Sequence, residues 1–134
     1  LFPDAPAIFD RQRSAGGLGD VVVIHLGNNG PFYRRHFEAV MARLRDVPLV
    51  VFVNLKLPRE WAAHNNKLLE QAVRHHPNAV LADWNAVAAE RPEIFWKDGY
   101  HVRAEGGRLY AELVRDAITA GVGRDIAAEE PPAP

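Results

Sequence analysis

The 134-residue sequence is long enough for one domain with a hydrophobic core, and its formal net charge of -1 excludes the strongly basic surface typical of nucleic-acid binding. Hydrophobic residues make up 48% of the chain and charged residues 25%, as in ordinary globular proteins. The chain has no cysteine, which excludes disulfides, thiolate nucleophiles and zinc-thiolate sites.

Segments with helical periodicity alternate with short apolar runs along the chain. The runs are rich in β-branched residues and do not alternate with polar ones, which is typical of strands covered on both faces of a parallel sheet. In chain order the sequence predicts a helix capped by Asp4, a strand at 21–26, a helix across 37–44, a strand at 49–55, a helix across 61–73, a strand at 79–84 and a helix across 109–118.

This alternation predicts an α/β fold, a three-layer α/β/α sandwich around a parallel sheet. We expect one domain across residues 1–126 and a disordered tail at 127–134, where the sequence is rich in Pro, Glu and Ala. Three strands make a thin sheet, and the chain opens directly with a helix. The sequence therefore reads as a fold that lacks its first strands.

Polar residues follow each predicted strand, at the edge of a parallel sheet where ligands bind. Gly27-Asn28-Asn29-Gly30 follows the first strand, Asn54 ends the second, and a long loop that reaches His101 follows the third. The Gly-Asn segment has two readings. It is a simple turn, or one of its amides donates a hydrogen bond to a developing oxyanion.

Asp98 and His101 stand three residues apart, with Gly99 between them. In the plain reading they form a turn or cap the helix that follows. In the catalytic reading the Asp98 carboxylate accepts a hydrogen bond from one ring nitrogen of His101 and leaves the other nitrogen free as a general base. His25 interrupts an apolar strand and is predicted to be a hydrogen-bonded core residue.

Three segments, "VVVIHLGNNGPF", "VFVNLKLPREW" and "VLADWNAVAAERPEIFWKDGYHVRAEGGRLYAELV", carry a family resemblance. Together they resemble the SGNH (GDSL-type) hydrolase superfamily, above all the extracytoplasmic SGNH domains fused behind membrane acyltransferases that O-acetylate peptidoglycan and other surface polysaccharides. The resemblance implies a flavodoxin-like SGNH fold. It also implies that Asp98 and His101 are two members of a catalytic triad, and that Asn29 is the oxyanion-hole amide, with Gly27 allowing the close turn.

Two positions differ from the pattern that the family usually shows. Asn28 stands where relatives often have Thr, and Tyr100 where they often have a small aliphatic residue. The candidates for pocket lining are Asn28, Asn54, Trp96 and Tyr100.

The family's nucleophile has no counterpart in this sequence, which contains no Gly-Asp-Ser. Its only serine, Ser14, lies within the first predicted helix and does not follow a strand. A serine in a helix lacks the sharp turn that exposes such a nucleophile. We therefore expect the nucleophile and the first strands to precede Leu1.

Three hypotheses follow. The first is a serine esterase or O-acyltransferase without metal or cofactor, which moves an acyl group from an ester donor to a sugar hydroxyl or water. By the resemblance it would be extracytoplasmic and attached to a membrane acyltransferase domain. The second is a catalytically silent, SGNH-like carbohydrate-binding or docking module. The third, a flavodoxin-like binding or receiver domain, is disfavoured because the segments after the strands are rich in amides and glycine.

Overall fold

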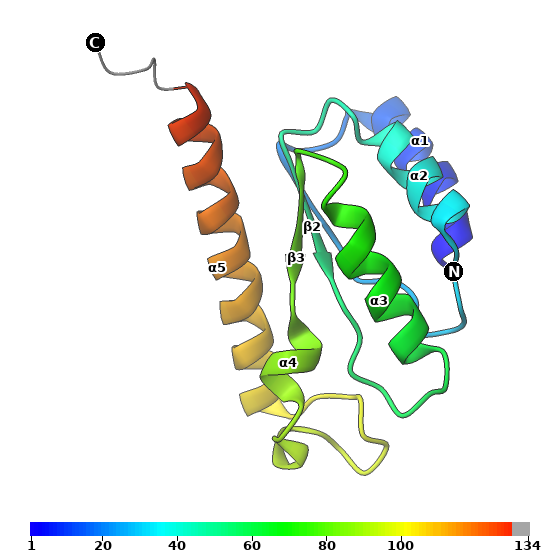
Figure 1. Ribbon diagram of the computed structural model, residues 1–134, viewed down its shortest axis with the longest axis vertical. Coiled ribbons are helices and arrows are strands. Elements are labelled where there is room, and N and C mark those ends of the chain that lie inside the picture. Colours follow the sequence, from blue (N-terminus) through cyan, green and yellow to red (C-terminus); the bar gives the residue numbers. More distant parts are fainter. Residues whose placement is uncertain (130–134) are drawn as a thin grey trace.

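The computed structural model describes residues 1–129, and its centre is a parallel sheet of three strands with helices on both faces (Figure 1). Two short 3-10 helices are labelled η1 and η2. In chain order the elements are η1 (Phe2–Asp4), α1 (Ala5–Ala15), β1 (Val21–Ile24), α2 (Arg34–Arg43), β2 (Leu49–Val53), α3 (Ala62–Val73), β3 (Ala79–Ala82), α4 (Trp84–Ala88), η2 (Pro92–Ile94) and α5 (Ala104–Glu129).

The predicted three-layer α/β fold is confirmed, including the order of its helices and strands. The sequence did not predict α4, which begins directly after β3 because the Asp83 side chain accepts a hydrogen bond from the Ala86 amide at 2.9 Å. Asp4 occupies the N-cap position of α1, but its side chain makes no capping hydrogen bond. Helix α5 extends to Glu129. The rest of the predicted tail, at 130–134, lies outside the described residues.

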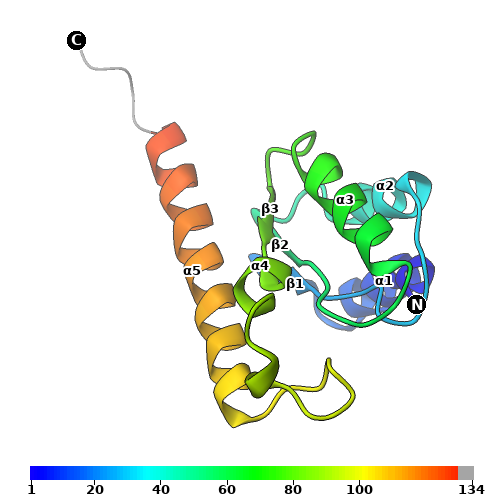
Figure 2. The same ribbon diagram turned by 60° about the horizontal axis from the view of Figure 1, so that its bottom comes forward.

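The sheet separates two hydrophobic layers, and β2 contributes to both. The strand order is β1-β2-β3, so β2 is central and every residue in it is buried. Val50 and Phe52 face the layer formed with α1, α2 and α3, whereas Leu49, Val51 and Val53 face the layer formed with α5. Figure 2 shows the same division, with α5 on one side of the strands and α1, α2 and α3 on the other.

Strand β1 differs from the prediction that every strand is covered on both faces. It lies at one edge of the sheet, and its Val23 side chain is 42% exposed. The reason is the position of α5, which packs against β2 and β3. Complete burial therefore holds for β2, while β1 keeps part of one face exposed.

The first turn of α5 approaches η2 closely at Gly106. A Cβ atom added to Gly106 would lie 2.7 Å from the backbone oxygen of Ile94 and 3.0 Å from the Val102 Cβ. Because backbone cannot move aside as a flexible side chain can, only glycine fits this position without strain. The contact places the start of α5 against the loop that carries Asp98 and His101.

Gly106→Ala is expected to lower the free energy of unfolding by about 1–3 kcal/mol, because the added methyl group overpacks this contact. Gly107→Ala is the matched control in the same helical turn. Its Cβ would meet the Val102 Cγ2 at 3.9 Å, an ordinary contact, so this variant should gain up to about 1 kcal/mol from helix propensity. Urea unfolding of both variants measures the difference. Equal stability of the two variants would contradict the close approach at Gly106.

Candidate active site

Asp98 and His101 form a hydrogen-bonded turn in the loop between η2 and α5. The Asp98 Oδ2 and the His101 Nδ1 are 2.7 Å apart, a short distance typical of a charge-assisted hydrogen bond. The Asp98 Oδ1 accepts hydrogen bonds from the backbone amides of Tyr100 at 3.1 Å and of His101 at 3.0 Å. Gly99 has a φ of +79°, which lets the chain fold back this tightly. The carboxylate therefore both shapes the turn and orients the ring.

The base of this loop is closed by backbone pairing and buried apolar contacts. Phe95 and Val102 form an antiparallel bridge, and the Trp96 amide donates to the His101 carbonyl at 2.8 Å. The Phe95 side chain is buried and contacts Trp84 edge to face, with ring centroids 6.1 Å apart. The turn is thus fixed to the hydrophobic layer beneath α5.

The pair itself is open to solvent, since the His101 side chain is 67% exposed and the Asp98 side chain 40% exposed. An ion pair this exposed contributes little to folding. The three hydrogen bonds to Asp98 nevertheless lower the pKa of its carboxyl group from 3.8 to about 2; the Tyr100 amide has the largest effect and the His101 ring the next. Asp98 is therefore a carboxylate at neutral pH, beside Nδ1 of His101.

Asp98 is expected to titrate near pH 2 in the folded protein, which can be measured from the carboxyl carbon shift in an NMR titration. Because the folded state lowers the pKa, ionised Asp98 favours folding above about pH 4, and this contribution is lost as the pH falls to about 2. In His101→Ala both backbone donors remain, so the titration midpoint should rise but stay below 3.8. A midpoint near 3.8 in the unaltered protein would contradict the hydrogen-bonded geometry.

The second candidate segment, residues 27–30, forms the start of the loop between β1 and α2. Gly27 has a φ of +116°, and a Cβ there would lie 3.0 Å from both the Asn65 Nδ2 and the Phe32 ring. The buried Asn65 side chain on α3 donates to the carbonyls of Gly27 and Gly30, both at 3.1 Å, and accepts from the Phe32 amide at 3.1 Å. The Trp61 indole also donates to the Gly27 carbonyl, at 3.1 Å.

Asn65 and Trp61 were not among the residues that the sequence singled out for the site. A signal was available for Asn65, because it lies four residues after Trp61 and four before Leu69, on the apolar stripe of α3. A polar residue on a buried helical stripe needs hydrogen-bond partners, and here those partners are the candidate loop.

A cavity of about 250 Å³ lies between the two candidate segments, and we call it the inter-loop cavity. It gathers residues from the loops after β1 and β2 and from the turn before α5: Asn28, Asn29, Leu57, Arg59, Trp61 and Tyr100. Tyr100 is the chain neighbour of His101, and their ring centroids are 4.3 Å apart. The structure therefore brings Asn28, Asn29 and Tyr100 to one cavity, whose described lining includes neither Asp98 nor His101.

The other predicted site residues occupy different places. Asn54 is buried and uses both ends of its amide, donating to Asp83 at 2.7 Å and accepting from the Asn85 amide at 2.8 Å. Trp96 is 56% exposed, and the Arg103 guanidinium lies 4.6 Å from its ring centroid. Among the described residues that line the inter-loop cavity, neither Asn54 nor Trp96 is found.

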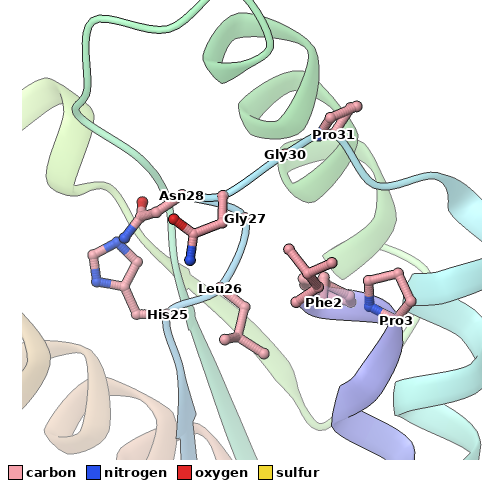
Figure 3. Close-up of a pocket in the computed structure, with 10 residues that line it drawn as sticks. Phe2, Pro3, His25, Leu26, Gly27, Asn28, Gly30 and Pro31 are labelled. Carbon is pink, nitrogen blue, oxygen red and sulfur yellow. The ribbon is translucent and has the colours of Figure 1, made fainter.

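The Gly-Asn loop also borders a second cavity, of about 320 Å³, whose lining includes Phe2, Pro3 and His25 (Figure 3). Figure 3 shows His25 and Asn28 on one side of the loop, and Phe2 and Pro3 on the other. Asn28 and Asn29 line both cavities. The loop therefore separates two hollows at the same edge of the sheet.

His25 is hydrogen-bonded, as predicted, through its Nδ1, which is 2.8 Å from the Tyr110 hydroxyl of α5. Burial lowers the pKa of His25 and raises that of Tyr110, so both groups are neutral at pH 7. The His25 Nε2 is buried and has no hydrogen-bond partner among the described residues.

Ser14 does not lie at this edge of the sheet. It is on the last turn of α1, which leads into the start of β1, whereas the candidate residues follow the ends of the strands. Its hydroxyl donates to the Asp10 carbonyl at 3.1 Å, one helical turn earlier. Ser14 therefore has the environment of a surface helix residue.

Among the side chains that the structure describes, those of residues 1–124, there is no cluster of three or more His, Asp or Glu suited to hold a metal ion. Of the helices that the structure describes, none combines the length and the apolar character needed to cross a membrane.

The fold and the site together define an α/β protein with an Asp-His pair and an amide-rich loop beyond the ends of parallel strands. No family model matches the chain. It is 32% identical, over 97 residues and 72% of its length, to a Bacillus subtilis protein named "Putative peptidoglycan O-acetyltransferase YrhL". It is 27% identical, over 114 residues and 85% of its length, to a Staphylococcus aureus protein named "O-acetyltransferase OatA".

These matches cover 15% of the first relative and 19% of the second, so the chain spans less than a fifth of either protein. Over most of its own length, however, it is similar to proteins named as O-acetyltransferases.

Proposed function

We propose that this chain supplies the Asp-His pair and the oxyanion loop of an SGNH-type serine O-acetyltransferase or esterase that acts on a cell-surface glycan. The observation that carries the proposal is the inter-loop cavity, whose lining joins Asn28 and Asn29 to Tyr100, the neighbour of His101. Acyl transfer from an ester requires an oxyanion donor and a general base near each other, and the cavity supports this pairing through Tyr100, which adjoins His101 in the chain. The names of the relatives support acetyl as the acyl group and peptidoglycan as the glycan.

In the proposed reaction, a serine hydroxyl attacks the ester carbonyl while the His101 Nε2 accepts the hydroxyl proton. Asp98, 2.7 Å from the His101 Nδ1, keeps that nitrogen protonated and stabilises the imidazolium. The Asn29 side-chain amide donates to the oxyanion of the tetrahedral intermediate. The imidazolium then protonates the departing alcohol. A sugar hydroxyl or water, deprotonated by His101, finally takes the acetyl group and restores the serine.

The proposal requires a serine from outside these 134 residues, because Ser14 lies toward the opposite end of the strands. Within the described residues β1 has a neighbouring strand on one side only, so its other edge is available to a strand that carries the nucleophile. We propose that the complete protein also holds a membrane acyltransferase domain and presents this site outside the cytoplasm, as the resemblance implies.

A fluorophosphonate probe tests the proposal, because it reacts covalently with an activated catalytic serine. A longer protein that includes this chain and the proposed serine should be labelled at that serine and should hydrolyse an aryl acetate. The 134-residue chain should do neither. Labelling of Ser14 in the short chain, or equal turnover by both proteins, would refute the proposed serine. A longer protein that binds glycan without being labelled would instead be a catalytically silent binding module.

A further inference from the structure

His25 and Tyr110 form a hydrogen-bonded pair that the proposed reaction does not use. His25 directly follows β1 and stands two residues before Gly27. Tyr110 is on α5, nine residues after His101. The His25 Nδ1 is 2.8 Å from the Tyr110 hydroxyl, and the two rings stack with their centroids 5.5 Å apart. The pair therefore connects the strand that leads into the Gly-Asn loop with the helix that follows the Asp-His turn.

Aromatic contacts continue from Tyr110 to the base of the Asp-His turn. The Tyr110 ring contacts the Trp84 ring edge to face, with centroids 5.3 Å apart, and Trp84 contacts Phe95 in the same way at 6.1 Å. Phe95 forms the backbone bridge with Val102 that closes the turn. A continuous series of packed rings therefore joins the end of β1 to the segment that carries the general base.

Packing alone does not account for a histidine at position 25. Its Nε2 is buried and has no hydrogen-bond partner among the described residues. A buried polar atom without a partner lowers stability, and an aliphatic side chain such as leucine would fill the place without this cost. What the histidine adds is a directional bond to Tyr110, which fixes both the distance and the angle between β1 and α5.

The chemistry of the site depends on this distance. An oxyanion donor is effective only when it lies about 2.7–3.1 Å from the developing charge, while the general base must reach the attacking hydroxyl. Asn29 is on the loop after β1, and His101 is on the turn before α5. Because α5 packs mainly against β2 and β3, its own packing does not fix the edge strand β1. The bond between His25 and Tyr110 supplies a direct connection.

We propose that His25 and Tyr110 are positioning residues, which hold the Gly-Asn loop at the distance from the Asp-His turn that acyl transfer requires. The inference rests on the proposed function, because it assigns a role within the same site. The two residues act through Asn29 and His101 and do not touch the reacting atoms themselves.

Tyr110→Phe removes the hydroxyl and keeps the ring, so it tests the hydrogen bond alone. In a longer protein that carries the proposed serine, kcat for aryl acetate hydrolysis should fall about 10- to 100-fold, while KM changes by less than about twofold. Glu38→Ala is the matched control, because it removes the carboxylate that lies 3.0 Å from the His76 Nε2, a histidine that stands just before β3 and away from the site. This control should leave kcat unchanged.

The double variant His25→Leu/Tyr110→Phe separates positioning from stability. Tyr110→Phe alone leaves the His25 Nδ1 without its partner and should lower the unfolding midpoint. Replacing both partners by apolar side chains removes that cost, so the midpoint should recover toward that of the unaltered protein. The kcat should stay low, because the directional bond is still absent. Recovery of kcat together with the midpoint would show a purely structural role and overturn the inference.

The 134-residue chain gives a readout that does not depend on catalysis. In Tyr110→Phe the amide NMR resonances of Asn28 and Asn29 should shift, and so should that of His101 at the other end of the series of rings. Shifts confined to the neighbours of residue 110 would contradict the inference. Failure of the proposed function is a separate result, in which both segments shift but the longer protein is not labelled by the fluorophosphonate. Labelling together with unchanged kcat in Tyr110→Phe removes this inference alone.

Discussion

His101→Ala should abolish acetyl-ester turnover, with a loss of kcat on the order of 10⁶, in a longer protein that carries the proposed serine. The reason is that His101 is the general base of the proposed mechanism, and its removal leaves the serine proton without an acceptor. The His101 Nδ1 already faces Asp98 at 2.7 Å, and the ring is exposed enough for its Nε2 to reach a substrate. The measurement is kcat for aryl acetate hydrolysis.

His75→Ala is the matched control, because His75 is also exposed but lies just beyond the end of α3, before β3 begins. It should leave turnover unchanged. Both variants should keep the same unfolding midpoint, since an exposed ion pair contributes little to stability. Turnover retained in His101→Ala would exclude this histidine as the general base.

Asp98→Asn should reduce kcat by about 10⁴ while the turn keeps its shape. The Asn Oδ1 can still accept from the backbone amides of Tyr100 and His101, as the Asp98 Oδ1 does. The group that faces the His101 Nδ1 changes, however, from a carboxylate oxygen to an NH₂ donor. The ring must then carry its proton on Nε2, and that nitrogen can no longer accept the serine proton.

The tautomer change gives this prediction a readout that a purely structural role would not produce. Nitrogen NMR of the His101 ring should show the neutral form protonated at Nδ1 in the unaltered protein and at Nε2 in Asp98→Asn. Asp83→Asn is the matched control, since the Asp83 Oδ1 likewise accepts two hydrogen bonds, from Asn54 and Ala86. It should keep full activity. An unchanged tautomer or unchanged kcat in Asp98→Asn would contradict the assigned role.

The Asp-His turn could be predicted from the sequence because its geometry is local. Asp98 and His101 are three residues apart, and the glycine between them permits the turn that joins them. The alternation of helices and strands was predictable for the same kind of reason, since each periodic pattern is contained within one short segment.

The arrangement of the inter-loop cavity could not be predicted in this way. Arg59 and Trp61 reach it from a loop some 40 residues before Tyr100 in the sequence, and only the packing of the sheet sets their distance. The exposed face of β1 was missed because an apolar run records what a strand can bury and not whether a helix covers it. Asn54 illustrates the same limit, since its position after β2 fits a ligand contact and the hydrogen bond to Asp83 equally well.

The two halves of the site are attached to opposite sides of the sheet. Asn65 fixes the Gly-Asn loop to the α3 side, whereas Phe95 fixes the Asp-His turn to the α5 side. The position of the Gly-Asn loop relative to the Asp-His turn thus depends on how the two hydrophobic layers pack against β2. Val51→Ala, which truncates a fully buried side chain between the two layers, should shift one layer against the other and lower turnover in the longer protein before it unfolds the domain. Selection for activity would then restrict the buried side chains around β2 as strongly as the residues that line the inter-loop cavity.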